Sequence, residues 1–310
     1  MKPLRDAWLI QIETTTACRR ACAHCTRGVR HYEKPLYAGL DFVERALESL
    51  AGWKKGVGCT GGEPTLHPEF PRICELYRRH FPKRQCGLWT CGGPSYERYR
   101  SLIDETFGII NYNDHALPCF HHPPMIASQE VIPDSAERDR LIDRCWLQLH
   151  WSPIATIRGG FFCEVAATFD ALFDGPGGYA LERGWWQKGG SEMADQREEY
   201  CRYCSIPLPI APLPDNLEED WVSRANAERL LAARSPLALN GRLKIVDGTV
   251  LGEAAGRDSR LYARRGATHC WARTPVRSWF WKRAKYKYLP HGELRFLRDT
   301  VKFLMEKVLE

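Results

Sequence analysis

Three cysteines near the start of the chain have a spacing that could hold an iron–sulfur cluster. Cys18, Cys22 and Cys25 form a C-x3-C-x2-C pattern directly after an apolar segment. Three thiolates so spaced can bind three irons of a [4Fe–4S] cube, which leaves the fourth iron free for another ligand. The alternative is a structural zinc site, in which His24 or His31 would complete a Cys3His set.

A glycine-rich turn further along the chain favours the cluster. Gly61, Gly62, Glu63 and Pro64 follow a short β-like segment at 56–60. Glycines let a ligand approach the backbone, and a glutamate can bind an ammonium group. A zinc knuckle does not require such a turn. Together, the turn and the cysteine triple resemble the radical S-adenosylmethionine (radical SAM) superfamily.

The resemblance implies roles for these motifs. Members of the superfamily hold a [4Fe–4S] cluster with three cysteines, and the amino and carboxylate groups of S-adenosylmethionine (SAM) bind its fourth iron. The cluster ligands here would be Cys18, Cys22 and Cys25. The SAM-binding residues would be Gly61, Gly62, Glu63, His24, Thr90, Asn111 and Asn113. His24 fits the position beside the adenine. A capped loop is an equally good interpretation of Asn111 and Asn113.

One position departs from the family pattern. Cys91, in the segment Leu88-Trp89-Thr90-Cys91-Gly92-Gly93, stands where many members have the asparagine of a Thr-Asn-Gly strand end. The contact that this asparagine makes with SAM is therefore not expected in this chain.

A second set of four cysteines follows in the middle of the chain. Cys145 and Cys163 flank a segment that reads as a β-hairpin, with its turn at 158–160, while Cys201 and Cys204 form a C-x2-C knuckle. Four cysteines can enclose a second [4Fe–4S] cluster. This part of the chain resembles the auxiliary-cluster domains called SPASM and Twitch, and the count of four favours Twitch. A zinc site is the alternative.

Length and composition indicate a soluble globular protein. The chain has 310 residues, of which 44% are hydrophobic and 26% are charged, with a net charge of +6. This length allows one large core and a smaller appendage. The apolar run at 8–10 is too short for a signal peptide, and no stretch approaches a transmembrane segment. We expect a cytoplasmic protein, in which 13 cysteines favour metal clusters over disulfides.

Short apolar segments alternate with amphipathic segments through the first half. They predict strands at 8–14, 56–60, 85–90 and 107–113, and helices at 41–52, 69–80 and 95–104. Such repeats predict an α/β fold, a partial (β/α)6 TIM-like barrel with ligands at the carboxyl ends of its strands. A small auxiliary Fe–S domain and a C-terminal helical and basic extension would follow. The predicted domains are 1–135 (barrel strands 1–5), 136–214 (barrel end and auxiliary cluster) and 215–310 (extension).

The last third of the chain is less informative. After a proline-rich connector at 206–214 we expect a helix at 216–234, a hairpin at 242–251 and a terminal helix at 292–309. The segment 257–288 interleaves basic and aromatic residues, a pattern that could bind nucleic acid, anionic lipid or a phosphorylated carrier. The simpler interpretation is a solvent-exposed segment that lies around the outside of the barrel and is anchored by its aromatic residues. Docking of an acidic reductant such as flavodoxin or ferredoxin is a third use.

The resemblance also implies a reaction. Reductive cleavage of SAM gives a 5′-deoxyadenosyl radical, which removes a hydrogen atom from the substrate. Tryptophans around the auxiliary cysteines suit a small polar substrate that is carbohydrate-like or cyclitol-like and either phosphorylated or carrier-linked. Electron transfer to the second cluster would give dehydrogenation, and a thiol hydrogen donor would give epimerisation. The candidate donors are Cys59, Cys91, Cys119 and Cys270.

Two other functions remain as alternatives. One is a radical SAM peptide maturase, although the predicted barrel begins within about ten residues and leaves no room for a preceding peptide-recognition domain. The other is a non-catalytic zinc or nucleic-acid-binding protein, for which the basic aromatic segment is the positive sign.

Overall fold

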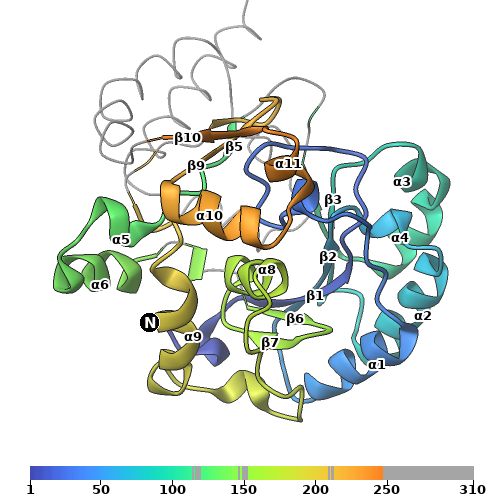
Figure 1. The fold of residues 1–310 in the computed structure, drawn as a ribbon. Helices are drawn as coiled ribbons and strands as arrows, with labels where there is room; N and C mark the ends of the chain where they lie inside the picture. The colour runs from blue at the N-terminus through green and yellow to red at the C-terminus, as the bar shows by residue number, and fades with distance from the viewer. Residues whose placement is uncertain are drawn as a thin grey trace, which may run out of the picture.

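A six-stranded sheet organises the computed structural model of the chain (Figure 1). Its strand order is β4-β3-β2-β1-β6-β7. Strands β1 to β4 are parallel, β6 runs parallel to β1 on the other side, and β7 is antiparallel to β6. The structure describes residues 1–113, 115, 120–145, 147–148, 153–208, 210 and 213–246.

The strands of the main sheet are β1 Leu9–Thr15, β2 Gly56–Gly61, β3 Cys86–Thr90, β4 Ile109–Tyr112, β6 Ile154–Thr156 and β7 Gly159–Phe161. Two small sheets contain β5 Phe120–His122 with β8 Leu213–Pro214, and β9 Asp220–Val222 with β10 Leu243–Ile245. The helices are α1 Leu40–Ser49, α2 Phe70–His80, α3 Pro94–Arg98, α4 Arg100–Thr106, α5 Ser128–Val131, α6 Ser135–Asp143, α8 Glu164–Leu172, α9 Ala194–Cys201, α10 Arg224–Ala232 and α11 Pro236–Leu239.

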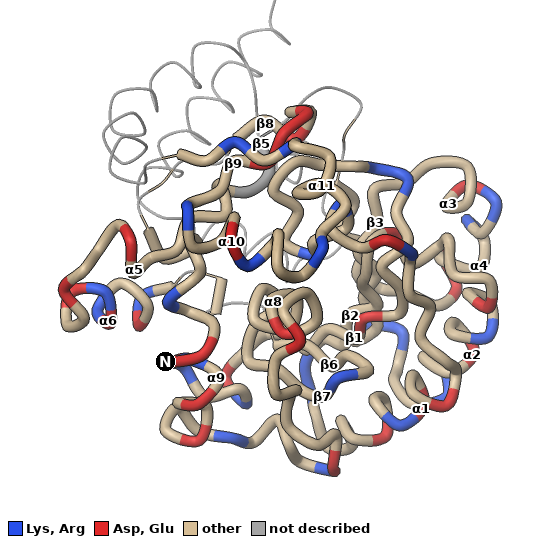
Figure 2. The backbone as a smooth tube through the Cα atoms, in the orientation of Figure 1, with Lys and Arg blue, Asp and Glu red and all other residues tan. Residues whose placement is uncertain are grey.

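The hydrophobic core lies between the sheet and the helices that follow its strands. Alternate residues of β1, such as Ile10 and Ile12, pack in the same core as the apolar stripes of α1 and α2, represented by Val43 and Ile73. Each of these helices repeats apolar residues at helical spacing and carries its charged residues on the outer side (Figure 2). The packing fixes the strands, and their carboxyl ends carry the loops that hold the predicted site.

The first four predicted strands and the helices at 41–52 and 69–80 are confirmed within a few residues. The predicted helix at 95–104 is two shorter helices, α3 and α4, which meet at Tyr99. The predicted hairpin between Cys145 and Cys163 is confirmed as β6 and β7, but its turn lies at 157–158 and not at 158–160, because Gly159 and Gly160 already pair with β6.

The (β/α)6 prediction needs correction in the arrangement of its last strands. Among the described residues, β5 does not join the main sheet but pairs with β8. Pro123 and Pro124 follow β5 and lack backbone N–H groups, which limits it to a short edge pairing. The hairpin β6–β7 joins the sheet at its opposite end, beside β1. The fold is therefore α/β with a mostly parallel sheet, consistent with a partial barrel.

The C-terminal predictions were partly wrong. Residues predicted as a helix at 216–234 form strand β9 and the shorter helix α10. Strand β10 lies in the predicted hairpin 242–251, but it pairs in parallel with β9. The basic segment 257–288, the predicted terminal helix and Cys270 are outside the described residues. Within the described residues, no helix has the length and apolar character needed to cross a membrane.

Candidate active site at the carboxyl ends of the strands

The three N-terminal cysteines lie on the loop that follows β1. Cys25 interacts electrostatically with both Cys22 and Cys18, so the structure brings the three thiols to one place. Burial raises the pKa of Cys25 to about 12, which favours the neutral thiol until a cation or metal offsets the charge. The donor set suits an iron–sulfur cluster, which binds cysteine sulfur at three or four positions.

The predicted zinc alternative depends on the two histidines named for it, which differ in their contacts. His31 places Nδ1 2.8 Å from Ser235 Oγ and Nε2 3.0 Å from Asp220 Oδ2, so both ring nitrogens face other groups. In His24, Nε2 accepts a hydrogen bond of 2.7 Å from the Trp221 backbone N–H. His31 therefore directs both ring nitrogens at other groups, whereas Nδ1 of His24 has no hydrogen-bond partner among the described residues.

A histidine that the sequence analysis did not single out lies beside Cys22. His115 Nδ1 is 3.9 Å from Cys22 Sγ and 2.6 Å from Asp215 Oδ2. Cys22, His115 and Asp215 could together hold a metal ion. Because Asp215 is distant in sequence, its place in this group could not be read from any local motif.

Glu63 is completely buried at the end of β2 and accepts hydrogen bonds from its own turn and from the end of β3. Its carboxylate accepts from the Thr65 backbone N–H at 3.2 Å and hydroxyl at 2.7 Å, from the Thr90 hydroxyl at 2.8 Å and from the Cys91 backbone N–H at 2.7 Å. All these donors are neutral. The site therefore retains one buried negative charge that an ammonium group could neutralise.

The glycines before Glu63 are required by the packing of the chain itself. A Cβ at Gly61 would lie 2.1 Å from the Thr15 carbonyl oxygen, and one at Gly62 would lie 2.3 Å from the Ala17 carbonyl oxygen. These close approaches pin the turn against the start of the cysteine loop. The predicted SAM contact of the two glycines remains a prediction.

Cys91 lies within this same group. Its thiol interacts with the thiol of Cys18, which lowers the pKa of Cys18 and raises that of Cys91. Thr90, predicted to bind SAM, contacts Glu63 as described above. Asn113 donates its backbone N–H to the Thr90 carbonyl at 2.8 Å, and Asn111 pairs with Trp89 across β3 and β4. All of these residues gather at one edge of the sheet.

Asp220, at the start of β9, holds the cysteine loop from the C-terminal side. It is 1% exposed and accepts from the His24 backbone N–H at 3.0 Å and from Arg30 at 3.1 Å, in addition to the His31 contact. Burial raises the pKa of Asp220, but its partners outweigh this effect and keep the pKa below the ordinary value. The His24 backbone is left-handed, with φ of 57°, and burial lowers the pKa of its ring to about 4.

The four middle cysteines also come together. Cys201 and Cys204 each interact with both Cys145 and Cys163. Cys201 is the last residue of α9, and Cys163 directly precedes α8. Burial raises the pKa of all four thiols. Four buried sulfur donors at one place fit either a [4Fe–4S] cluster or zinc.

A buried charged group joins the two cysteine sites. Arg27, two residues after Cys25, forms an ion pair with Glu13 on β1 and reaches the backbone oxygen of Glu164 at 3.4 Å. Glu164, directly after Cys163, accepts from Gln11 Nε2 at 2.7 Å and from Thr26 Oγ1 at 3.2 Å. These contacts fix the cysteine loop relative to helix α8.

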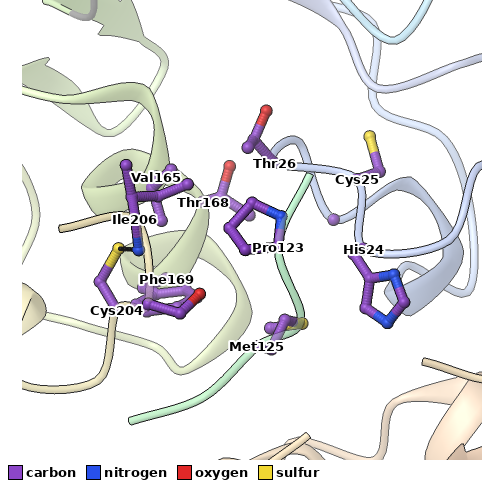
Figure 3. A pocket seen from close by; sticks show the side chains of 12 residues that line it. His24, Cys25, Thr26, Pro123, Met125, Val165, Thr168, Phe169, Cys204 and Ile206 are labelled. Atoms are coloured by element: carbon purple, nitrogen blue, oxygen red, sulfur yellow. Dashed lines mark hydrogen bonds between the residues drawn. The ribbon is translucent and has the colours of Figure 1, made fainter. Parts of the chain in front are cut away.

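A small cavity lies between the two cysteine sites, with a volume of about 30 Å³. Cys25 and Cys204 both line it, and Figure 3 places them on opposite sides of the view. Among the described residues, His24 Nδ1 and Thr168 Oγ1 are buried without a hydrogen-bond partner, and both residues line this cavity. Buried polar atoms of this kind are commonly satisfied by water or a ligand.

Of the predicted hydrogen donors, Cys59 is fully buried in the hydrophobic core, where its Sγ lies 3.9 Å from Thr14 Oγ1. Cys119 lies outside the described residues.

The sequence of residues 12–125 matches the family model described as the radical SAM superfamily. The chain contains a radical SAM domain. Such a domain implies an enzyme that uses SAM, a [4Fe–4S] cluster and a reductant. The matched range includes the cysteine triple, Glu63 and Cys91.

No curated protein sequence matches the chain. Two distantly similar solved structures are BtrN in complex with AdoMet and 2-DOIA, and Streptococcus suis SuiB bound to S-adenosylmethionine. BtrN is 13% identical, with a TM-score of 0.42 over 64% of this chain and 88% of its own. SuiB is 13% identical, with a TM-score of 0.29 over 84% of this chain and 57% of its own.

Proposed function

We propose that the protein is a radical SAM dehydrogenase with an auxiliary [4Fe–4S] cluster of the Twitch type, acting on a small polar substrate. The observation that carries this proposal is the common cavity of the two cysteine sites, lined by Cys25 and Cys204. A substrate between the two sites could lose a hydrogen atom on one side and an electron on the other. Epimerisation is the second candidate outcome.

The residues fit these groups in a consistent way. Cys18, Cys22 and Cys25 would hold the first cluster, and Cys145, Cys163, Cys201 and Cys204 would hold the second. When bound, SAM and the first cluster supply a 5′-deoxyadenosyl radical, while the second cluster supplies an electron acceptor. Glu63 would bind the SAM ammonium through its uncompensated charge.

The protein residues around the cavity have the remaining tasks. Arg27, Glu13 and Glu164 do not line the cavity, but they form a buried polar set that would fix the two cysteine sites relative to each other. The apolar lining, which includes Val165 and Phe169, would exclude water from a reactive intermediate.

Dehydrogenation is favoured over epimerisation because the two candidate thiol donors within the described residues, Cys59 and Cys91, are poorly placed. Cys59 faces α2, and Cys91 lies against Cys18 and Glu63, at the end of the site assigned to the amino group of SAM. A hydrogen donor would instead have to face the substrate. The substrate class, a carbohydrate-like or cyclitol-like molecule, is part of this proposal, as are a cytoplasmic location and a flavodoxin or ferredoxin reductant.

The test measures iron, sulfide and SAM cleavage in anaerobically purified protein after dithionite reduction. We expect about eight irons per wild-type chain and about four in a Cys145→Ala/Cys163→Ala variant, with 5′-deoxyadenosine produced by the wild type. A Cys74→Ala/Cys86→Ala variant is the matched control, because both cysteines are fully buried on the helix-packed side and belong to neither site. Zinc in place of iron, or iron without SAM cleavage, would refute the catalytic proposal.

A further inference from the structure

One arginine lies between two elements that carry the auxiliary cysteines. Arg229, on helix α10, places its guanidinium carbon 3.8 Å from the centre of the Tyr203 ring and 4.1 Å from the centre of the Phe173 ring. Tyr203 stands between Cys201 and Cys204 in the C-x2-C knuckle, and Phe173 directly follows helix α8. The positive charge is therefore held between two aromatic faces, beside the knuckle.

The backbone of the knuckle is also fixed by hydrogen bonds from neighbouring helices. Asn226, three residues before Arg229 on α10, is completely buried and donates its side-chain amide to the Tyr203 backbone oxygen at 3.0 Å. From helix α5, the Ser128 hydroxyl donates to the Cys201 backbone oxygen at 2.9 Å. Helix α10 thus holds Tyr203 at two points, at its backbone through Asn226 and at its ring through Arg229.

The charge of Arg229 is not neutralised by an ion pair with any of the described residues, and its Nη1 atom is buried without a hydrogen-bond partner among them. The neighbouring Arg202 instead pairs with Glu199 at 3.4 Å. Burial lowers the pKa of Arg229, but a guanidinium remains protonated in proteins. An uncompensated positive charge therefore stays beside the auxiliary cysteines.

We propose that Arg229 is a positioning residue, which holds the knuckle through Tyr203 and raises the reduction potential of the auxiliary cluster. This inference rests on the proposed function, in which the four auxiliary cysteines hold a [4Fe–4S] cluster. Net charge around a cluster is one of the factors that set its potential. A fixed positive charge stabilises the reduced form, because that form carries one more negative charge than the oxidised form.

The inference deepens the proposed function because a higher potential makes the cluster a better electron acceptor. In the proposed dehydrogenation, a substrate radical that bears a hydroxyl group becomes a ketone. It loses one electron, which the oxidised cluster gains, and the hydroxyl proton, which passes to solvent. Arg229 would favour this electron transfer without touching the substrate.

The test is a redox titration of the two-cluster enzyme, followed by electron paramagnetic resonance. The auxiliary signal is the one that Cys145→Ala/Cys163→Ala lacks. At a fixed applied potential, Arg229→Gln should lower the ratio of reduced to oxidised auxiliary cluster by about tenfold, a shift of about 59 mV. Arg229→Lys keeps the charge and should stay close to the wild type. Arg224→Gln, at an exposed arginine on the same helix, is the control and should match the wild type.

Two further outcomes keep the test decisive. Arg229→Met, which retains an apolar stem, replaces the first variant if Arg229→Gln does not hold the auxiliary iron. An unchanged potential in the uncharged variant overturns the inference. So does an equal fall in Arg229→Lys, because packing rather than charge would then set the potential. Zinc in the four-cysteine site, or full iron in Cys145→Ala/Cys163→Ala, refutes the cluster assignment itself, whereas a cluster that ignores Arg229 refutes only the role of this residue.

Discussion

At the scale of single residues, Glu63 has the most informative environment. It is a fully buried carboxylate whose partners are hydroxyl and backbone donors, with no basic side chain among its described hydrogen bonds. A buried charge that is solvated only by neutral donors is expensive unless a cation joins it. The environment is therefore suited to a cationic ligand, which agrees with the role proposed for it.

Replacing Glu63 with glutamine tests this role. The amide keeps the size and can still accept hydrogen bonds, but it has no charge to offset an ammonium group. We expect the SAM dissociation constant to rise by about tenfold to a hundredfold, corresponding to the roughly 1.5–3 kcal/mol of a charged hydrogen bond. Calorimetric titration of the cluster-containing enzyme with SAM measures this dissociation constant. Glu69→Gln, at an exposed carboxylate on the same turn, is the control, and an equal effect of both variants would contradict the prediction.

Sequence reasoning named most of the residues that the structure brings together at this candidate site, because they come in compact motifs. The cysteine triple and the glycine-rich turn each occupy a few consecutive positions. The contacts of Asp215 and Asp220 could not be predicted, because about 200 residues separate them from the loop they hold. Cys91 was visible as a departure from the family pattern, but its contact with Cys18 depends on how β1 and β3 end.

At the scale of elements, Asp170 holds together the parts that carry the auxiliary cysteines. This residue of α8 is completely buried and forms an ion pair with Arg158 in the β6–β7 turn. Its other oxygen accepts from the Tyr200 hydroxyl at 2.7 Å and from the Gly177 backbone N–H at 2.8 Å. Because Tyr200 directly precedes Cys201, the carboxylate links helix α8 to helix α9 and to the hairpin.

We expect Asp170→Asn to lower the free energy of unfolding by about 2 kcal/mol, which is less than the roughly 3–5 kcal/mol for breaking a fully buried ion pair because Arg158 is partly exposed. The auxiliary site should lose iron first, while SAM binding persists. Urea unfolding and iron analysis measure the two effects. Asp174→Asn is the control, since that carboxylate also contacts Arg158 at 3.6 Å but is 99% exposed. If Asp170→Asn kept its full iron content and its free energy of unfolding, Asp170 would not be what holds α8, α9 and the hairpin together.

The elements themselves were predictable where local periodicity is strong. Helices α1 and α2 and strands β1 to β4 have clear apolar patterns, and they were predicted within a few residues. The predicted helix at 216–234 failed at its start, because Asp220–Val222 form a strand that pairs with β10. That pairing is a tertiary contact, which outweighs the helical pattern of the neighbouring residues.

At the scale of the whole molecule, the segment 213–246 closes the fold onto its beginning. The Asp215 backbone oxygen accepts from the Ala23 N–H at 2.8 Å, and the Glu218 backbone oxygen accepts from Arg30. Asp220 adds the three contacts described above. The loop that carries Cys18, Cys22 and Cys25 is therefore held between β1 and the C-terminal segment. Residues from the first and the last parts of the described chain therefore position the Cys18, Cys22 and Cys25 site together.

Replacing Asp220 with asparagine should weaken this closure throughout the protein. The change keeps the shape but removes the charge shared by Arg30 and His31, so we expect the free energy of unfolding to fall by about 3 kcal/mol. Iron should be lost from the first site, because the loop is no longer held, while the auxiliary cysteines keep theirs. Glu218→Gln is the matched control: its side chain is 85% exposed, and its backbone contact with Arg30 survives the change. If Asp220→Asn retained all its iron and unfolded at the wild-type urea concentration, β1 and the loop itself would be sufficient to form the site, and the C-terminal segment would only cover it.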